Sequence, residues 1–84
     1  MSRKDKLLQR IARLPRDFTW SELETLLGHL GFEMVRRGKT AGSRRRFIHE
    51  NGAVISLHKP HPGNILRAYQ VKQVVEILVE EGLL

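Results

Sequence analysis

Arginine and histidine side chains crowd the middle of this 84-residue chain. Arg44, Arg45 and Arg46 stand in a row, and His58 and His61 follow in a proline-rich segment. Histidine exchanges a proton near neutral pH, and arginine carries a permanent planar cation. Attack of an RNA 2′-hydroxyl on its own phosphate needs proton carriers and nearby cations. We therefore take Arg44, His58 and His61 as candidate catalytic residues; alternatively, the two histidines only bond the loop backbone.

Positive charge is concentrated in one part of the sequence. The chain carries fifteen Lys and Arg against nine Asp and Glu, a net charge of +6, and residues 36–46 contain no acid. Such a local positive field favours a polyanion, although a merely solvated surface is the bland alternative. Three consecutive arginines in a predicted strand favour a nucleic acid. The predicted RNA-binding residues are Arg36, Arg37, Lys39, Arg44, Arg45, Arg46 and Lys59.

Several classes of protein do not fit the composition. The absence of cysteine excludes disulfides and thiolate chemistry and suits a reducing compartment, so we expect a cytoplasmic protein. Charges run through residues 1–16, and no apolar run is long enough to span a bilayer, so we expect neither a signal peptide nor a membrane partner. His58 and His61 have no adjacent carboxylate, and no phosphate-cradling glycine loop is present. We expect no metal and no small-molecule cofactor.

Two helices are predicted in the first third of the chain. Residues 3–13 are predicted to form a helix that ends at Pro15, and Leu7, Leu8, Ile11 and Leu14 have the spacing of its apolar stripe. Thr19 and Glu22 have the spacing of a capping box for a second helix. Gly31 stands where a left-handed C-terminal cap is expected.

The remainder predicts three strands and one more helix. The strands are placed at residues 32–36, 44–49 and 54–57. The last two form a hairpin around Asn51-Gly52. Residues 58–64 contain two prolines and a glycine and cannot be regular. The last helix buries a stripe of apolar residues: Val71, Val74, Val75, Leu78 and Val79.

This order predicts an α+β fold with a three-stranded antiparallel sheet and helices on one face. Without the first helix, the α-β-β-β-α order is that of a double-stranded-RNA-binding domain. We expect residues 1–16 to form an N-terminal helical extension and residues 17–84 to form the RNA-binding domain.

The length of the hairpin loop determines which arginines are exposed. A two-residue loop places Ile48 opposite Ile55, whereas a three-residue loop of residues 50–52 places Phe47 opposite Ile55. We prefer the second register because it groups Phe47 with Ile55 and Leu57 on the core face, although Ile48 then lies on the other face.

In that register Arg44, Arg46 and Ser56 share the exposed face of the sheet. In either register the end of the third strand lies beside the start of the second. We therefore expect His58 close to Arg44 or Arg45, where a histidine and an arginine could flank one phosphate.

From Thr19 to about Val79 the chain resembles the HicA family of toxins. The resembling segments are Ser21-Glu22-Leu23, Gly31-Phe32-Glu33-Met34-Val35-Arg36, Gly42-Ser43-Arg44-Arg45-Arg46-Phe47, Ile55-Ser56-Leu57, and His61 through Leu66. The resemblance implies a double-stranded-RNA-binding-like fold, messenger-RNA cleavage without a metal, and neutralisation by a HicB-like antitoxin.

One position departs from the family pattern. The family's usual motif is Gly-Ser-His, with the histidine taken as catalytic, whereas this chain has Arg44 there. Arginine does not give up its proton at ordinary pH and cannot act as a general base. The chain therefore looks like a longer branch of the family that carries Gly-Ser-Arg.

The leading functional hypothesis is the toxin component of a type II toxin–antitoxin pair, an endoribonuclease acting on messenger RNA. Two alternatives stay open. The first is a non-catalytic RNA-binding module that acts by occlusion, and the second is a basic protein-interaction domain.

Overall fold

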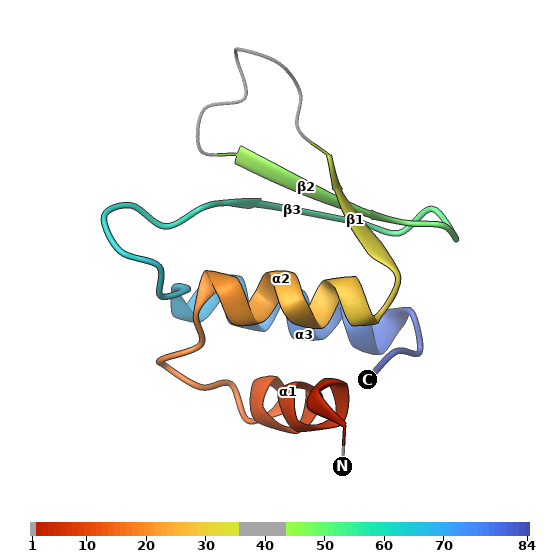
Figure 1. Ribbon diagram of the computed structural model, residues 1–84, viewed down its shortest axis with the longest axis horizontal. Helices are drawn as coiled ribbons and strands as arrows, with labels where there is room; N and C mark the ends of the chain where they lie inside the picture. The colour runs from red at the N-terminus through yellow and green to blue at the C-terminus, as the bar shows by residue number, and fades with distance from the viewer. Residues whose placement is uncertain (1, 36–43) are drawn as a thin grey trace.

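Three layers make up the molecule, an antiparallel sheet and two layers of helix (Figure 1). The computed structural model describes residues 2–35 and 44–84. The elements in chain order are α1 (Arg3–Ala12), α2 (Trp20–His29), β1 (Phe32–Val35), β2 (Arg44–His49), β3 (Val54–His58) and α3 (Ala68–Glu80). Helices α2 and α3 lie along one face of the sheet, and α1 lies beyond them on the side away from it. The predicted α+β class and the α-β-β-β-α order after α1 are confirmed.

Helix α1 ends where the sequence places a proline. Its last residue is Ala12, and Leu14, directly before Pro15, has a left-handed φ of 54°. A proline disfavours the helical conformation of the residue that precedes it, which explains the stop. Leu14 is therefore 50% exposed, and its predicted place in the apolar stripe of the helix is wrong.

The capping box of α2 is present as predicted. The Thr19 hydroxyl accepts the Glu22 N–H at 3.1 Å, and a Glu22 carboxylate oxygen accepts the Thr19 N–H at 3.0 Å. At the other end Gly31 has a φ of +95°, the left-handed cap that was expected. A Cβ at Gly31 would lie 3.1 Å from the His49 ring, so the turn also leaves little room for a side chain.

The core lies between the sheet and the two helices beside it. Phe47, Ile55 and Leu57 are buried on one face of the hairpin, and the Trp20 ring lies 5.7 Å from that of Phe47. Helix α3 adds Val71, Val74 and Leu78, and α1 adds Leu7 and Ile11 to the same cluster. Val79 is 55% exposed, so the predicted stripe of α3 is one residue too long.

The hairpin has the preferred register. Phe47 pairs with Ile55, Arg46 with Ser56 and Arg44 with His58. The loop is the three-residue one, with Gly52 at a φ of +96°. The His49 N–H donates to the Ala53 carbonyl at 2.9 Å, so this pair is hydrogen-bonded. Because bonded and non-bonded pairs alternate in an antiparallel ladder, Arg44–His58 is a non-bonded pair, the kind whose side chains lie closer together.

The outer edge of β3 is bound by glutamines of α3. The Gln70 amide donates to the His58 carbonyl at 2.8 Å, and the Gln73 amide donates to the Ser56 carbonyl at 3.4 Å. Gln70 also accepts the Arg67 N–H at 3.0 Å and is 2% exposed. This side chain therefore fixes the end of β3 to the start of α3.

In the part of the chain that the structure describes, no helix is long and apolar enough to cross a membrane.

Candidate nucleic-acid interface

The face of the sheet turned away from the helices carries the first part of the site. This open face comprises Glu33, Val35, Arg44, Arg46, Ile48, Val54, Ser56 and His58, as the strand register and pleat require. Arg44, Arg46 and His58 are exposed. Glu33 supplies an acid beside Ile48, toward the other end of the face from Arg44. The open face is therefore basic where β2 begins and β3 ends.

The sheet places two of the predicted catalytic residues, Arg44 and His58, side by side. They are directly opposite each other on β2 and β3. In a non-bonded antiparallel pair the Cα atoms are about 4.5 Å apart and both side chains rise from the same face. The expectation that His58 lies beside Arg44 is confirmed. Such a cation–imidazole pair has the dimensions to contact a single phosphate group from two sides.

Arg45 points to the other face of the sheet. It pairs with Leu57, whose side chain is buried under the helices, and is itself half-buried. Its Nη1 donates to the Arg44 carbonyl at 3.0 Å. The row of three arginines is therefore divided by the pleat, and only Arg44 and Arg46 share the open face.

A hollow beyond the end of β3 supplies the second part of the site. This loop hollow has a volume of about 450 Å³, and its lining consists of His58, Lys59, Pro60, His61, Pro62, Ile65, Arg67, Tyr69 and Gln70. It brings together three of the sequence-predicted residues, His58, His61 and Lys59. His58 belongs to both the loop hollow and the pair with Arg44, so the two parts of the site meet at this residue.

The loop is held in place by backbone contacts with the segment before α2. The Trp20 N–H donates to the Asn64 carbonyl at 2.6 Å, and the Leu66 N–H donates to the Phe18 carbonyl at 2.8 Å. Thr19 and Ile65 form an isolated antiparallel bridge between these bonds. Residues 59–64 are irregular as predicted, whereas His58, predicted to lie in the irregular segment, is the last residue of β3. The backbone contacts tie this loop to the helical layer.

Arg67 and Tyr69 are site residues that the sequence analysis missed. Both line the loop hollow at the start of α3 and both are exposed. The sequence did contain a signal for Tyr69. This aromatic residue comes before the apolar stripe of the last helix and does not belong to it. Arg36, Arg37 and Lys39, which were predicted to bind RNA, lie outside the described residues.

His49 takes no part in the site. Its Nδ1 accepts the Asn51 N–H at 3.1 Å, so Nε2 carries the proton and donates to the Leu30 carbonyl at 3.0 Å. The ring is half-buried and packs edge-on against Phe32 at 5.0 Å. His49 therefore joins the hairpin to the end of α2 and has a structural role.

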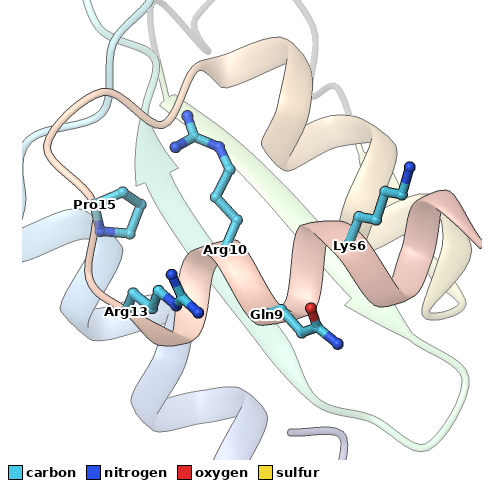
Figure 2. A pocket seen from close by; sticks show the side chains of 5 residues that line it. All are labelled: Lys6, Gln9, Arg10, Arg13 and Pro15. Carbon is cyan, nitrogen blue, oxygen red and sulfur yellow. The ribbon is translucent and has the colours of Figure 1, made fainter. Parts of the chain in front are cut away.

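A second basic hollow lies on α1 (Figure 2). Lys6, Gln9, Arg10, Arg13 and Pro15 line it. Figure 2 shows Arg10 extending from α1 toward the chain that precedes α2. Its guanidinium is already engaged by the chain's own carboxylates, so this hollow offers fewer available cations than its composition suggests.

Arg10 forms an ion-pair network with Asp17 and Glu22. Arg10 donates to Glu22 from Nε at 3.0 Å and to Asp17 from Nη1 at 2.9 Å, and it lies 5.2 Å from the centre of the Phe18 ring. Hydrogen bonds from the Arg10 guanidinium lower the pKa of Glu22 from 4.5 to about 2, and the same bonds raise the pKa of Arg10. The network stabilises the packing of α1 against α2.

Within residues 2–35 and 44–84 no group of three or more histidine and acidic side chains is arranged to hold a metal ion.

Fold and site together define a class, small proteins with a double-stranded-RNA-binding-like fold that carry basic and histidine side chains on the open face of the sheet. A family model described as the HicA toxin of bacterial toxin–antitoxin systems matches residues 20–78. The chain therefore belongs to the HicA toxin family, and its membership implies an antitoxin partner. The match begins at the first residue of α2, so α1 lies outside it. Comparisons with curated proteins and with solved structures gave no match.

Proposed function

We propose that this toxin binds messenger RNA on the open face of its sheet and cuts it beside the Arg44–His58 pair. The observation that carries the proposal is the exposed cross-strand pairing of a permanent cation with an imidazole. Arg46 adds a second cation on the same face, two residues along β2. Fixed cations beside a phosphate stabilise the charge that develops there during transfer.

The groups present suffice for cleavage by the RNA's own 2′-hydroxyl. The His58 imidazole accepts the 2′-hydroxyl proton as the 2′-oxygen attacks phosphorus, and Arg44 stabilises the charge on the phosphate. His61, in the loop hollow, supplies a proton to the departing 5′-oxygen. The bond from phosphorus to that oxygen breaks, which leaves a 2′,3′-cyclic phosphate and a free 5′-hydroxyl. No metal is required in this scheme.

This scheme accounts for the departure from the family motif. Arg44 occupies the position where the family has a histidine, and arginine cannot accept a proton. Its neighbour across the ladder, His58, has the chemistry that the substitution removes. We propose that proton transfer has moved from β2 to β3 while the cationic role stays on β2.

We propose that the partner is a HicB-like antitoxin that covers the Arg44–Phe47 segment and the loop of residues 58–64. Acidic groups of the partner would meet the basic end of the open face and hasten association. The proposed substrate places the toxin's action in the cytoplasm, where messenger RNA is translated.

The test is cleavage of a defined RNA by the parent and by His58→Ala, His61→Ala and Arg44→Ala. All of these side chains are exposed, so the variants should fold like the parent. We expect His58→Ala to slow cleavage by about 10²-fold or more while RNA affinity stays nearly unchanged, as is usual for a general base. The product ends should carry 2′,3′-cyclic phosphate. Parent-like rates in both histidine variants would refute this mechanism.

A second function, occlusion of messenger RNA without cleavage, is favoured by one observation, the presence of Arg44 in place of the family histidine. It predicts RNA binding by the parent with no new RNA ends. Restoring the family residue with Arg44→His would then create or increase cleavage. A basic protein-interaction domain, the remaining alternative, would show no RNA affinity at moderate salt.

A further inference from the structure

Tyr69 is an aromatic side chain that the core does not use. It is 60% exposed, more than any other large apolar or aromatic side chain among the described residues. It lies in the first turn of α3 and lines the loop hollow with His58, Lys59 and Arg67. Burial in the core cannot explain an aromatic ring held at this position.

The surroundings of Tyr69 indicate the chemistry of a ligand. The lining of the loop hollow contains Lys59 and Arg67 as cations, two histidines, and no acidic residue. Such a site suits a ligand that has both a negative charge and a flat unsaturated ring. A nucleotide has both, because its phosphate can meet the cations while its base stacks on the tyrosine.

The position of the hollow relates it to the proposed cleavage site. His58 is both a lining residue of the loop hollow and the partner of Arg44 across the ladder. A phosphate between Arg44 and His58 would therefore have its neighbouring nucleotide at the mouth of the hollow. A base inside a duplex has both faces covered by its stacked neighbours and cannot present one to a side chain, so we expect the nucleotide there to be unpaired and unstacked.

We propose that Tyr69 is a base-stacking platform that holds the unpaired nucleotide next to the phosphate bound by Arg44 and His58. This inference rests on the proposed function. It assigns Tyr69 a role in positioning the RNA, with Lys59 and Arg67 contacting the phosphate on the far side of that nucleotide. The site then selects an unpaired segment of RNA, although the fold is of the type that binds duplexes.

The test uses single-stranded oligonucleotides with 2′-O-methyl riboses, which block attack by the 2′-oxygen, and with 2-aminopurine at one position at a time. Stacking of 2-aminopurine on an aromatic ring quenches its fluorescence. With the parent protein we expect one position to be quenched on binding. Tyr69→Leu should abolish that quenching and weaken binding by about tenfold, whereas Tyr69→Phe should retain both, since stacking requires only the ring.

Val79→Ala is the matched control, because it shortens another exposed side chain of the same helix that does not line the hollow. It should leave quenching and affinity unchanged. If the parent binds RNA and Tyr69→Leu binds it equally, the role of Tyr69 is refuted and the proposed function stands. If the parent binds no RNA, the proposed function itself fails. If Tyr69→Leu weakens only antitoxin binding, Tyr69 is a protein contact and the inference is overturned.

Discussion

Arg44, Arg45 and Arg46 have the same side chain but different surroundings. The pleat directs Arg44 and Arg46 to the open face and Arg45 toward the helices. Only the first two can therefore contact one RNA backbone together. The predicted set of RNA-binding residues treats the three alike, whereas the structure assigns them to two different faces.

The salt dependence of RNA binding should report this division. Each phosphate contact made by a cation contributes about 0.7–0.9 to the slope of log affinity against log salt. We expect Arg44→Ala combined with Arg46→Ala to lower the slope by about 1.5, from affinities measured across a range of salt concentrations. Arg13→Ala, which removes an exposed arginine of α1, is the control and should leave the slope unchanged. If Arg13→Ala lowered the slope and the double variant did not, the RNA would contact α1 and not the open face.

At the scale of elements, α1 is attached to the start of α2 through Arg10 and Glu22. The pKa of Glu22 is lowered from 4.5 to about 2 in the folded state by hydrogen bonds from Arg10. Between these two values the folded protein binds fewer protons than the unfolded chain, so its stability rises with pH. The contribution is complete above pH 4.5 and disappears as the pH falls toward 2.

We therefore expect the parent to lose about 1–3 kcal/mol of unfolding free energy relative to Glu22→Gln as the pH falls through this window. Denaturant unfolding at a series of pH values measures the difference. Glu24→Gln is the control, since its carboxylate is not among the ion-pair partners of Arg10. Parallel curves for the parent and Glu22→Gln would show that the ion pair does not contribute to stability.

The elements themselves were largely predictable because their signals are local. The Thr19 capping box and Gly31 predict the two ends of α2. The grouping of Phe47 with Ile55 and Leu57 favours the hairpin register that the structure has. Local sequence patterns do not predict contacts between residues that are far apart in the chain. Gln70 looks like a surface residue in the sequence and is 2% exposed in the fold.

The candidate site was likewise predictable only where its contacts are local in the sequence. The pairing of His58 with Arg44 followed from the hairpin, since one register places them opposite each other. Arg67 and Tyr69 join the site only because α3 returns to the end of β3, a contact between elements that local patterns do not encode.

For the whole molecule, α1 is a third layer rather than an independent segment. Leu7 and Ile11 belong to the same buried cluster as the residues of α2 and α3, although the family match begins at Trp20. A chain that keeps only residues 20–78 would expose the apolar surface that α1 covers. The buried core therefore runs across the expected division between an extension of residues 1–16 and a domain of residues 17–84, and that division stays a prediction.

Removing buried volume from α1 should therefore destabilise the whole fold. Ile11 is completely buried, and Ile11→Ala should cost about 2–4 kcal/mol of unfolding free energy, as core truncations of this size do. Leu14→Ala is the matched control, because Leu14 is 50% exposed beyond the end of the helix, and it should cost far less. Chemical denaturation with a single transition would show both effects. An equal small cost for both variants would mean that α1 packs only loosely.

The two glutamines on α3 have a consequence for the behaviour of the protein at high concentration. An outer strand with unoccupied carbonyls is a template on which a strand from another molecule can add, and repeated addition leads to fibres. Gln70 already binds the His58 carbonyl, and Gln73 binds the Ser56 carbonyl, along this edge of β3. Accumulating copies of the toxin therefore meet a closed edge at this end of β3, and polymerisation through it is disfavoured.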